Sequence, residues 1–404
     1  MRNTKPIMNS GCDITLWRLL ASVLLFLSIL RGIRFPNIWS YSHFLFNYDF
    51  GFTKRGFIGA LFSHLNNHYP ISYECFLIVS IVICSINIIL LSILIRDFIR
   101  SAEPALLGCS LIYASSLAVV FLSHSIGYCD HVGLLFALVT LNITGFYKKL
   151  LFSLPSMAVA LLVHEAIIVV FFPIVFMSLL FSIESEERIR KLLLLGLFSA
   201  ALLALGLFVS ASTLETSEAH KMYNSLQASI EHPLRQTAFD VLHRTSKDTL
   251  DIMKEMWSHK RRYIDLLRSC VVTGPAFLVF IYFSTSILRK SKTKAYFVLL
   301  SILASLSPLL LHNVGWDMHR WNTLAVTTSF LMLHIAYRRR CTTEPIATSG
   351  NIYLVCVFVI FVNGMSSISL FDGYDVKEFP FNEHQRYVYG VINGTEIFPY
   401  VPPR

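Results

Sequence analysis

Residues 150–182 read LLFSLPSMAVALLVHEAIIVVFFPIVFMSLLFS, an apolar run whose only ionisable side chains are His164 and Glu165 in its middle. A helix that spans a membrane needs about 20 apolar residues, so this run is too long for one ordinary span. As a single crossing it would also place the basic connectors 148–149 and 188–191 on opposite sides of the membrane. Because short Lys- and Arg-rich connectors gather on the cytoplasmic side, we predict a hairpin of two short helices that turns at His164-Glu165.

The rest of the chain is similarly apolar. Of its 404 residues, 54% are hydrophobic, only 15% are charged and 32 are Phe, a composition that excludes a soluble protein of this size. With the hairpin counted as two helices, we predict an all-α, polytopic bundle of about eleven transmembrane helices in a single integral-membrane domain, residues 1–404. The apolar runs are 14–30, 73–95, 105–122, 132–147, 150–182, 192–210, 270–288, 295–311, 323–337 and 351–370.

The basic residues predict how the chain is oriented. A net charge of +9 would suit a nucleic-acid partner, but the Lys and Arg residues lie mainly in short connectors beside the apolar runs, so no nucleic acid is expected. We predict a multi-pass protein of a bacterial inner (plasma) membrane, with its N-terminus in the cytoplasm and its C-terminus outside. The first run is followed by Arg31-Gly32-Ile33-Arg34 rather than by a small-residue cleavage site, which indicates a retained helix.

Two longer segments fall outside the membrane in this topology. Residues 211–269 have mixed charge and lack an apolar stretch of spanning length, which predicts short amphipathic helices packed on the outer face. Residues 371–404 are rich in Tyr, Phe and Pro and form the predicted outer C-terminal tail.

The same topology places four clusters of ionisable residues on the outer side. Charged groups at or near bilayer depth are costly, so their default interpretation is a functional site. The clusters are Asp49 with Lys54 and Arg55, Asp130 with His131, His164 with Glu165, and Asp317 with His319 and Arg320.

The first cluster lies among aromatic residues and glycines in the loop FNYDFGFTKRGFIG, residues 46–59. Asp49 can act as a general base whose pKa is tuned by Lys54 or Arg55, while the two cations hold a phosphate. The alternative is an interfacial loop whose long basic side chains reach the headgroups.

The two central clusters are shorter. Asp130-His131 can orient a base or bind a cation, or Asp130 can simply cap the helix that follows it. His164-Glu165 is similar to the start of a zinc-protease motif, but Ile168 stands where the second histidine is required, so no metal site is predicted. A Glu this deep must be neutral or paired, and a mutually satisfied buried pair is the structural alternative.

The densest cluster is LHNVGWDMHRWN, residues 311–322. Arg320 offers planar, bidentate donors for phosphate or carboxylate, and Trp316 and Trp321 can stack on a sugar or anchor the chain at the interface. An Asp317–Arg320 ion pair at a helix start is the alternative.

In its many helices, its first-loop acid and its polar outer loops, the chain resembles the GT-C superfamily of integral-membrane glycosyltransferases and the related polymerases of bacterial surface polysaccharides. The octapeptide DFGFTKRG, residues 49–56, is also similar to a loop of uncharacterised polytopic proteins from polysaccharide gene clusters. The resemblance implies transfer of a sugar or glycan from a polyprenyl-(pyro)phosphate carrier to a glycan or lipid acceptor at the outer membrane face, with Asp49 as general base.

The resemblance also suggests roles for the other cluster residues. No Asp-Glu or Asp-x-Asp pair stands in the first outer loop, so no cofactor is implied and a divalent cation has no motif to support it. No large soluble C-terminal domain follows, which argues against an oligosaccharyltransferase. The implied roles are acid/base or orientation for Asp317, His164 and Glu165, phosphate binding for Lys54, Arg55, Arg320 and His319, and support for Asp130, His131, Trp316 and Trp321.

Two other classes stay open. A secondary transporter or flippase of a lipid-linked or anionic substrate would need charges that lead to both sides of the membrane. A membrane acyltransferase would need a catalytic histidine, for which His164 is the candidate.

Overall fold

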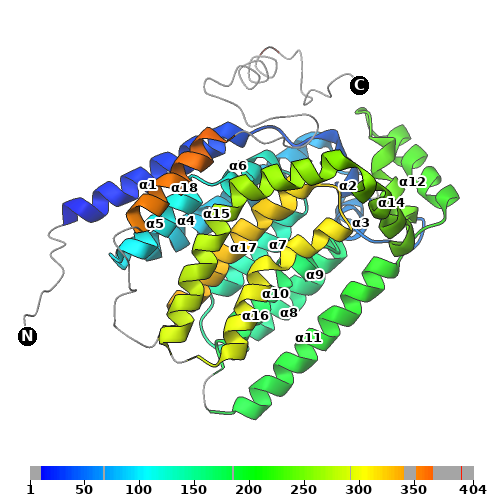
Figure 1. The fold of residues 1–404 in the computed structure, drawn as a ribbon. Coiled ribbons are helices and arrows are strands. Elements are labelled where there is room, and N and C mark those ends of the chain that lie inside the picture. Colours follow the sequence, from blue (N-terminus) through cyan, green and yellow to red (C-terminus); the bar gives the residue numbers. More distant parts are fainter. Residues whose placement is uncertain are drawn as a thin grey trace, which may run out of the picture.

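The computed structural model describes residues 11–66, 69–183, 186–291, 293–340 and 352–366 together with Asn393, and within them the chain is helical without β-strands (Figure 1). The predicted all-α class is therefore confirmed, while the predicted tail, apart from Asn393, lies outside the described residues. The elements are α1 (Gly11–Gly32), α2 (Ile38–Phe44), α3 (Phe57–Leu65), α4 (Tyr73–Arg100), α5 (Pro104–Ala114), α6 (Leu117–His124), α7 (Asp130–Asn142), α8 (Phe146–Val163), α9 (Ile167–Val170), α10 (Phe172–Leu180), α11 (Arg188–Ala211), α12 (Thr216–Ser229), η1 (Gln236–Ala238), α13 (Asp240–His243), α14 (Ser246–Ser258), α15 (Lys260–Lys290), α16 (Ala295–Leu306), η2 (Ser307–Asn313), α17 (Met318–Arg339) and α18 (Ile352–Met365).

Seven helical stretches in the described part of the chain are long and apolar enough to cross a membrane. Three shorter apolar stretches accompany them. The long ones are Ile14–Gly32, Tyr73–Arg100, Pro104–His124, Phe146–Val163, Arg188–Ala211, Lys260–Lys290 and Ala295–Asn313, and the shorter ones are Asp130–Asn142, Ile167–Leu180 and Tyr353–Met365.

The run 150–182 is divided in two at the predicted point. Helix α8 ends at Val163 because His164 adopts an extended conformation, with φ −159° and ψ 116°. The next helical turn begins at Ile167, and α10 then packs against both α8 and α7. The polar pair His164-Glu165 thus lies at a break between two packed helical arms.

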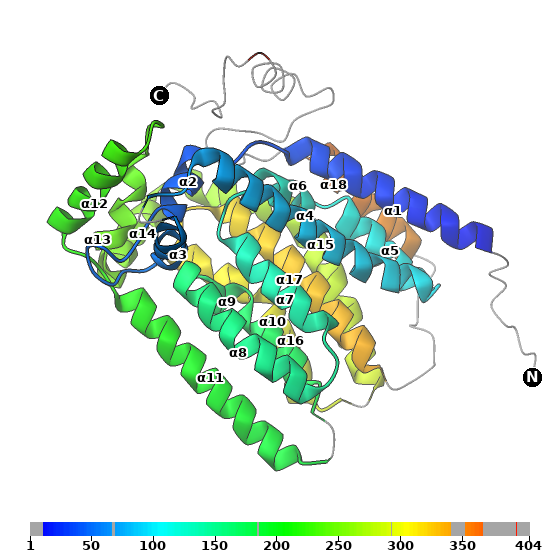
Figure 2. The same cartoon turned by 180° about the vertical axis from the view of Figure 1, so that it is seen from behind.

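Helix α17 lies at the centre of the bundle and packs against α15, α16, α10, α6 and α5 (Figures 1 and 2). Every residue from Trp321 to Ala336 is buried. Because protein rather than lipid surrounds it, the helix tolerates several Thr and Ser residues and a histidine, and the hydroxyl groups of Thr323, Thr327 and Thr328 donate to backbone carbonyls within the bundle. Its first turn carries Arg320 to one end of the bundle.

Helices α2, α3, α12 and α14 gather at that end, away from the start of α1 (Figures 1 and 2). Helices α2, α3 and α12 share a second hydrophobic core, separate from that of the main bundle, to which the first loop gives Tyr41 and Phe46 and the insertion gives Met222 and Phe239. The Arg235 amide also donates to Ser42 Oγ at 3.1 Å. The insertion is therefore packed onto the first loop as one unit.

Residues 211–258 of the predicted insertion 211–269 contain short helices, and residues 260–269 form the first turns of the long helix α15. Thr245 and Asp248 form a capping box that starts α14, and α15 already begins at Lys260. Buried Arg262 anchors the polar first turns of α15 to the segment 312–315, because it donates to the carbonyl oxygens of His312 and Gly315 at 3.3 and 2.9 Å.

Basic residues link neighbouring helices at the opposite end of the bundle. Lys149 at the start of α8 donates to Ser178 Oγ of α10 at 2.7 Å, and Arg338 at the end of α17 donates to the Leu141 carbonyl of α7 at 2.9 Å. Arg340 pairs with Glu103 beside the start of α5. The basic connectors 148–149 and 338–340 thus meet at one end, which is the end opposite Arg320.

Candidate functional site

A cavity of about 760 Å³ opens at the Arg320 end of the bundle. Its walls come from α2, the loop at residues 54–55, the break at residues 164–165, the insertion, and the segment 311–321. The Asp, Glu, His, Lys and Arg residues of the lining are His43, Lys54, Arg55, His164, Glu165, Arg235, Asp240, Arg244, Asp317 and Arg320. The fold therefore brings members of three of the four predicted clusters to one cavity, and a member of the fourth, Asp130, binds Arg320 from behind.

Arg55 and Glu165 form a bidentate ion pair across the cavity wall. Nε and one terminal nitrogen of Arg55 donate to the two carboxylate oxygens of Glu165 at 2.9 and 2.5 Å. Burial opposes ionisation of Glu165, but Arg55 and His164 outweigh it and hold the pKa of this carboxyl well below its usual range. Arg55 has a φ of 66°, a left-handed conformation that costs a non-glycine residue about 1–2 kcal/mol. Strain of this kind is typical of functional sites.

Arg320 forms the second buried ion pair. Its Nε and one terminal nitrogen lie 2.7 and 2.6 Å from Asp130 Oδ2, and its other terminal nitrogen lies 3.4 Å from Asp317 Oδ2. The side chains of Arg320 and Asp130 are only 8% and 7% exposed. The guanidinium also stands 4.6 Å from the centre of the Trp321 ring. Asp130 therefore does not only stand at the start of α7, because its main partner is the guanidinium of Arg320.

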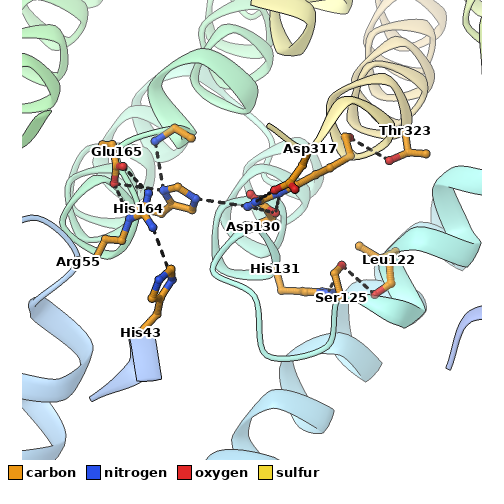
Figure 3. Close-up of polar contacts among 12 residues, drawn as sticks. His43, Arg55, Leu122, Ser125, Asp130, His131, His164, Glu165, Asp317 and Thr323 are labelled. Atoms are coloured by element: carbon orange, nitrogen blue, oxygen red, sulfur yellow. Dashed lines mark hydrogen bonds and ion pairs between the residues drawn. The ribbon is translucent and has the colours of Figure 1, made fainter. Parts of the chain in front are cut away.

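His164 joins the two ion pairs, with Glu165 on one side and Asp130 and Asp317 on the other (Figure 3). A terminal nitrogen of Arg320 lies 3.3 Å from Nε2, and Nδ1 lies 3.2 Å from Glu165 Oε2. Because Arg can only donate, Nε2 must accept, which leaves the proton of a neutral ring on Nδ1 to bond Glu165. His164 thus links the ion pairs and has both ring nitrogens engaged.

His43 of α2 lies on the far side of Arg55 (Figure 3). Its Nδ1 is 3.5 Å from a terminal nitrogen of Arg55, and the rings of Trp39 and Phe46 pack around it. Its buried Nε2 has no hydrogen-bond partner among the described residues. A buried ring nitrogen beside a cavity is costly unless something satisfies it, which points to a ligand or water there.

Lys54 is a buried cation, 6% exposed. Its Nζ donates to the carbonyl oxygen of Arg244 at 2.9 Å, and no ion pair of Lys54 exists within the described residues. Burial in the cavity wall lowers its pKa. An ammonium group with one neutral acceptor and two further protons is suited to bind an anion in the cavity.

The structure does not bring Asp49 to this cavity. The side chain is exposed, and the residue lines a separate pocket of about 60 Å³ with Asn47 and Ser63. The turn at residues 48–51, closed by the Gly51 amide on the Tyr48 carbonyl at 3.1 Å, directs Asp49 away from Arg55. Proximity in sequence to Lys54 and Arg55 therefore does not bring this carboxylate to the cavity.

Two further predicted residues lie off the cavity lining. His131 is buried behind it, with Nε2 3.4 Å from Ser125 Oγ and its carbonyl bonded by Asn87 at 2.9 Å. His319 is half-buried and is not among the lining residues. Within the described residues, no group of three His, Cys, Asp or Glu side chains has the arrangement of a metal site.

The sequence reasoning missed several lining residues. Trp39 and His43 come from the first loop, and Arg235, Asp240 and Arg244 come from the insertion. No motif marks them, because they reach the cavity only through the packing of the insertion onto α2.

We expect the stability of the protein to fall as the pH falls below about 6.5. Burial and the charge of Arg55 lower the pKa of His43 well below its usual range and lower that of His164 too. The unfolded chain takes up these two protons near pH 6.5, whereas the folded chain resists them, so their contribution is complete above that pH and is lost as the pH falls toward the folded pKa values. Glu165, with its lowered pKa, loses its contribution only below about pH 4.5.

Thermal unfolding of the detergent-solubilised protein at pH 7.5 and 5.5 checks this expectation. His43→Gln should lessen the loss at pH 5.5, and His220→Gln, at an exposed position of α12, should not. An equal pH dependence in wild type and His43→Gln would contradict the assignment.

Comparisons of the chain with models of protein families, with curated proteins and with solved structures find no match. The contacts described above are therefore the basis for proposing a function.

Proposed function

We propose that the protein is a membrane glycosyltransferase that transfers a sugar or glycan from a polyprenyl-(pyro)phosphate carrier to an acceptor in surface polysaccharide synthesis. The observation that carries the proposal is Lys54, a buried ammonium in the wall of a large cavity, with Arg55 and Arg320 in the same lining. Three cations around one cavity suit a di- or monophosphate, and planar guanidinium groups suit its oxygens.

We place the cavity at the outer face of a bacterial inner membrane. The seven long apolar stretches, the three shorter ones and α17 together give eleven crossings. This arrangement puts the basic connectors at the bundle end opposite the cavity, where the positive-inside rule favours the cytoplasm. The N-terminus is then cytoplasmic. A GT-C-like arrangement of the helices, which the resemblance implied, is also part of this proposal.

The proposed reaction uses Asp317 as the general base in place of Asp49. Asp317 lines the cavity, its side chain is 32% exposed, and its contact with Arg320 is long at 3.4 Å. The acceptor hydroxyl attacks the anomeric carbon and gives its proton to the Asp317 carboxylate. The bond from that carbon to the phosphate oxygen breaks, and the phosphate leaves with the electron pair, stabilised by Lys54, Arg55 and Arg320.

Two other carboxylates, Glu165 and Asp130, are less suited to this role. Both oxygens of Glu165 are held by Arg55, and Asp130 lies behind Arg320 outside the lining. His164 has both ring nitrogens engaged, by Arg320 and by Glu165, which disfavours it as the catalytic histidine of an acyltransferase.

A transporter or flippase of a lipid-linked or anionic substrate is the second candidate function. Buried His334 near the other end of α17 has its Nε2 3.6 Å from Asp97 Oδ2 of α4. An ionisable pair inside the bundle and remote from the cavity is the kind of group that a transport path uses. In proteoliposomes a transporter would move a polyprenyl-linked glycan intact, whereas the proposed transferase would separate glycan and carrier.

Lys54→Gln is expected to lower the affinity for inorganic pyrophosphate about tenfold, because one charge-assisted contact is lost. Isothermal titration of the purified full-length protein measures this, and release of polyprenyl phosphate from lipid-linked glycans extracted from the host membrane measures transfer. Lys254→Gln, an exposed lysine of α14 that pairs with Asp251, is the matched control and should change neither. Equal pyrophosphate binding by Lys54→Gln and wild type would refute the phosphate site.

A further inference from the structure

The cavity has a second group of residues that the phosphate does not need. Trp316, Asp240 and Arg244 line it beyond the buried cations, and two of the three come from the insertion. They are an aromatic ring, a carboxylate and a guanidinium, which are the groups that recognise the C–H face and the hydroxyl groups of a sugar ring.

Trp316 is 45% exposed, and the other four tryptophans of the chain are buried or half-buried. Its position is fixed by Gly315, where an added Cβ would come within 2.7 Å of the Trp321 ring. The Arg244 guanidinium stands 5.8 Å from the centre of the Trp316 ring. The turn thus holds a large, accessible aromatic surface in the cavity lining.

Asp240 and Arg244 are held one helical turn apart by α13. An Arg244 terminal nitrogen donates to Asp240 Oδ2 at 2.9 Å, and the Asp240 side chain is 35% exposed. Within the described residues, no protein donor bonds the second carboxylate oxygen of Asp240. A carboxylate with an open acceptor and an adjacent guanidinium can bond two neighbouring sugar hydroxyls.

These residues adjoin the proposed reaction centre on two sides. The carbonyl oxygen of Arg244 accepts the bond from Lys54, so the insertion residue that stands over Trp316 also holds a phosphate-binding cation. Trp316 immediately precedes Asp317, which contacts Arg320. The base therefore lies between the aromatic surface and a phosphate-binding guanidinium.

We propose that Trp316, Asp240 and Arg244 form a carbohydrate subsite for the acceptor glycan. The inference rests on the proposed function, since a base must lie beside the acceptor hydroxyl while the cations hold the leaving phosphate on its other side. The acceptor's terminal sugar stacks on Trp316, its hydroxyls bond Asp240 and Arg244, and its attacking hydroxyl reaches Asp317. The acceptor is thus a sugar-terminated chain rather than a simple lipid alcohol.

The test is to titrate the full-length protein with maltose, lactose and N,N′-diacetylchitobiose and to follow tryptophan fluorescence and heat of binding. We expect at least one disaccharide to bind in the millimolar range, with Trp316→Leu lowering its affinity about tenfold and Trp316→Phe much less. Asp240→Asn should lower the affinity about fivefold. Asp251→Asn, a carboxylate of a similar helical ion pair outside the cavity lining, should leave it unchanged.

Inorganic pyrophosphate, titrated into the same variants, separates this inference from the proposed function. Trp316→Leu and Asp240→Asn should bind pyrophosphate within about twofold of wild type, because they leave the phosphate contacts in place. No binding of any of the three disaccharides, or equal binding by Trp316→Leu and wild type, would overturn the subsite. Disaccharide binding without pyrophosphate binding would support the subsite and refute the phosphate site instead.

Discussion

Arg320→Met is expected to lower the free energy of unfolding by about 3–5 kcal/mol, because it leaves the Asp130 carboxylate buried without its cation. The Asp130 side chain is only 7% exposed, and its Oδ2 receives two contacts from Arg320. Its Oδ1 is already buried without a partner among the described residues, so the loss of the guanidinium leaves the carboxylate without any hydrogen-bond donor there. Unfolding of the purified protein by SDS in mixed micelles measures the change.

A double variant distinguishes a charge effect from a packing effect. Arg320→Met with Asp130→Leu removes both charges, and a buried ion pair replaced by apolar groups is often close to neutral in stability. We expect the double variant to recover most of the loss seen in Arg320→Met. If it is as unstable as the single variant, the cost arises from packing around Trp321 rather than from an orphaned carboxylate.

Asp317→Asn is expected to lower the rate of glycan transfer by about 10²–10⁴-fold, the range typical for loss of a general base. The substitution keeps the size of the side chain and removes its ability to take a proton. Because the Asp317 side chain is partly exposed, the variant should fold with wild-type stability. Transfer from extracted lipid-linked glycans in proteoliposomes gives the rate, and an unchanged pyrophosphate affinity would place the loss in chemistry.

Asp49→Asn is the matched comparison, since Asp49 is the carboxylate that the sequence alone favoured. It lines the separate small pocket and should retain a transfer rate within about twofold of wild type. A large loss in Asp49→Asn with none in Asp317→Asn would restore the original assignment and contradict the cavity-based one.

The sequence predicted the helical class because apolar runs of spanning length leave few other structures for a backbone that lacks water. It also predicted the break at His164, where a charged pair interrupts an over-long run. The apolar run 323–337 also predicted helix α17, although protein surrounds this helix and its Thr, Ser and His residues dilute the apolar signal. Hydropathy reports contact with lipid, so it weakens for a helix that has none.

The site was predicted in part for a related reason. Arg55, Glu165, Asp130 and Arg320 are conspicuous in sequence because charges in an apolar chain require partners. The pairing itself depends on which helix ends meet, and no local pattern encodes it. Asp49 lies outside the cavity lining because one tight turn separates it from Arg55. Asp240 was missed because an acidic residue in a polar insertion is ordinary.

The shared hydrophobic core of α2 and the insertion also has a thermodynamic meaning for ligand binding. Lys54, held by the Arg244 carbonyl, and His43, held among aromatic rings, occupy their positions before any ligand arrives. Binding to Lys54 and His43 therefore does not require these two groups to become ordered, and it avoids the entropic cost that such ordering carries. These groups become ordered when the protein folds. The association of a ligand with this cavity should therefore show little of the large unfavourable entropy that accompanies coupled folding and binding.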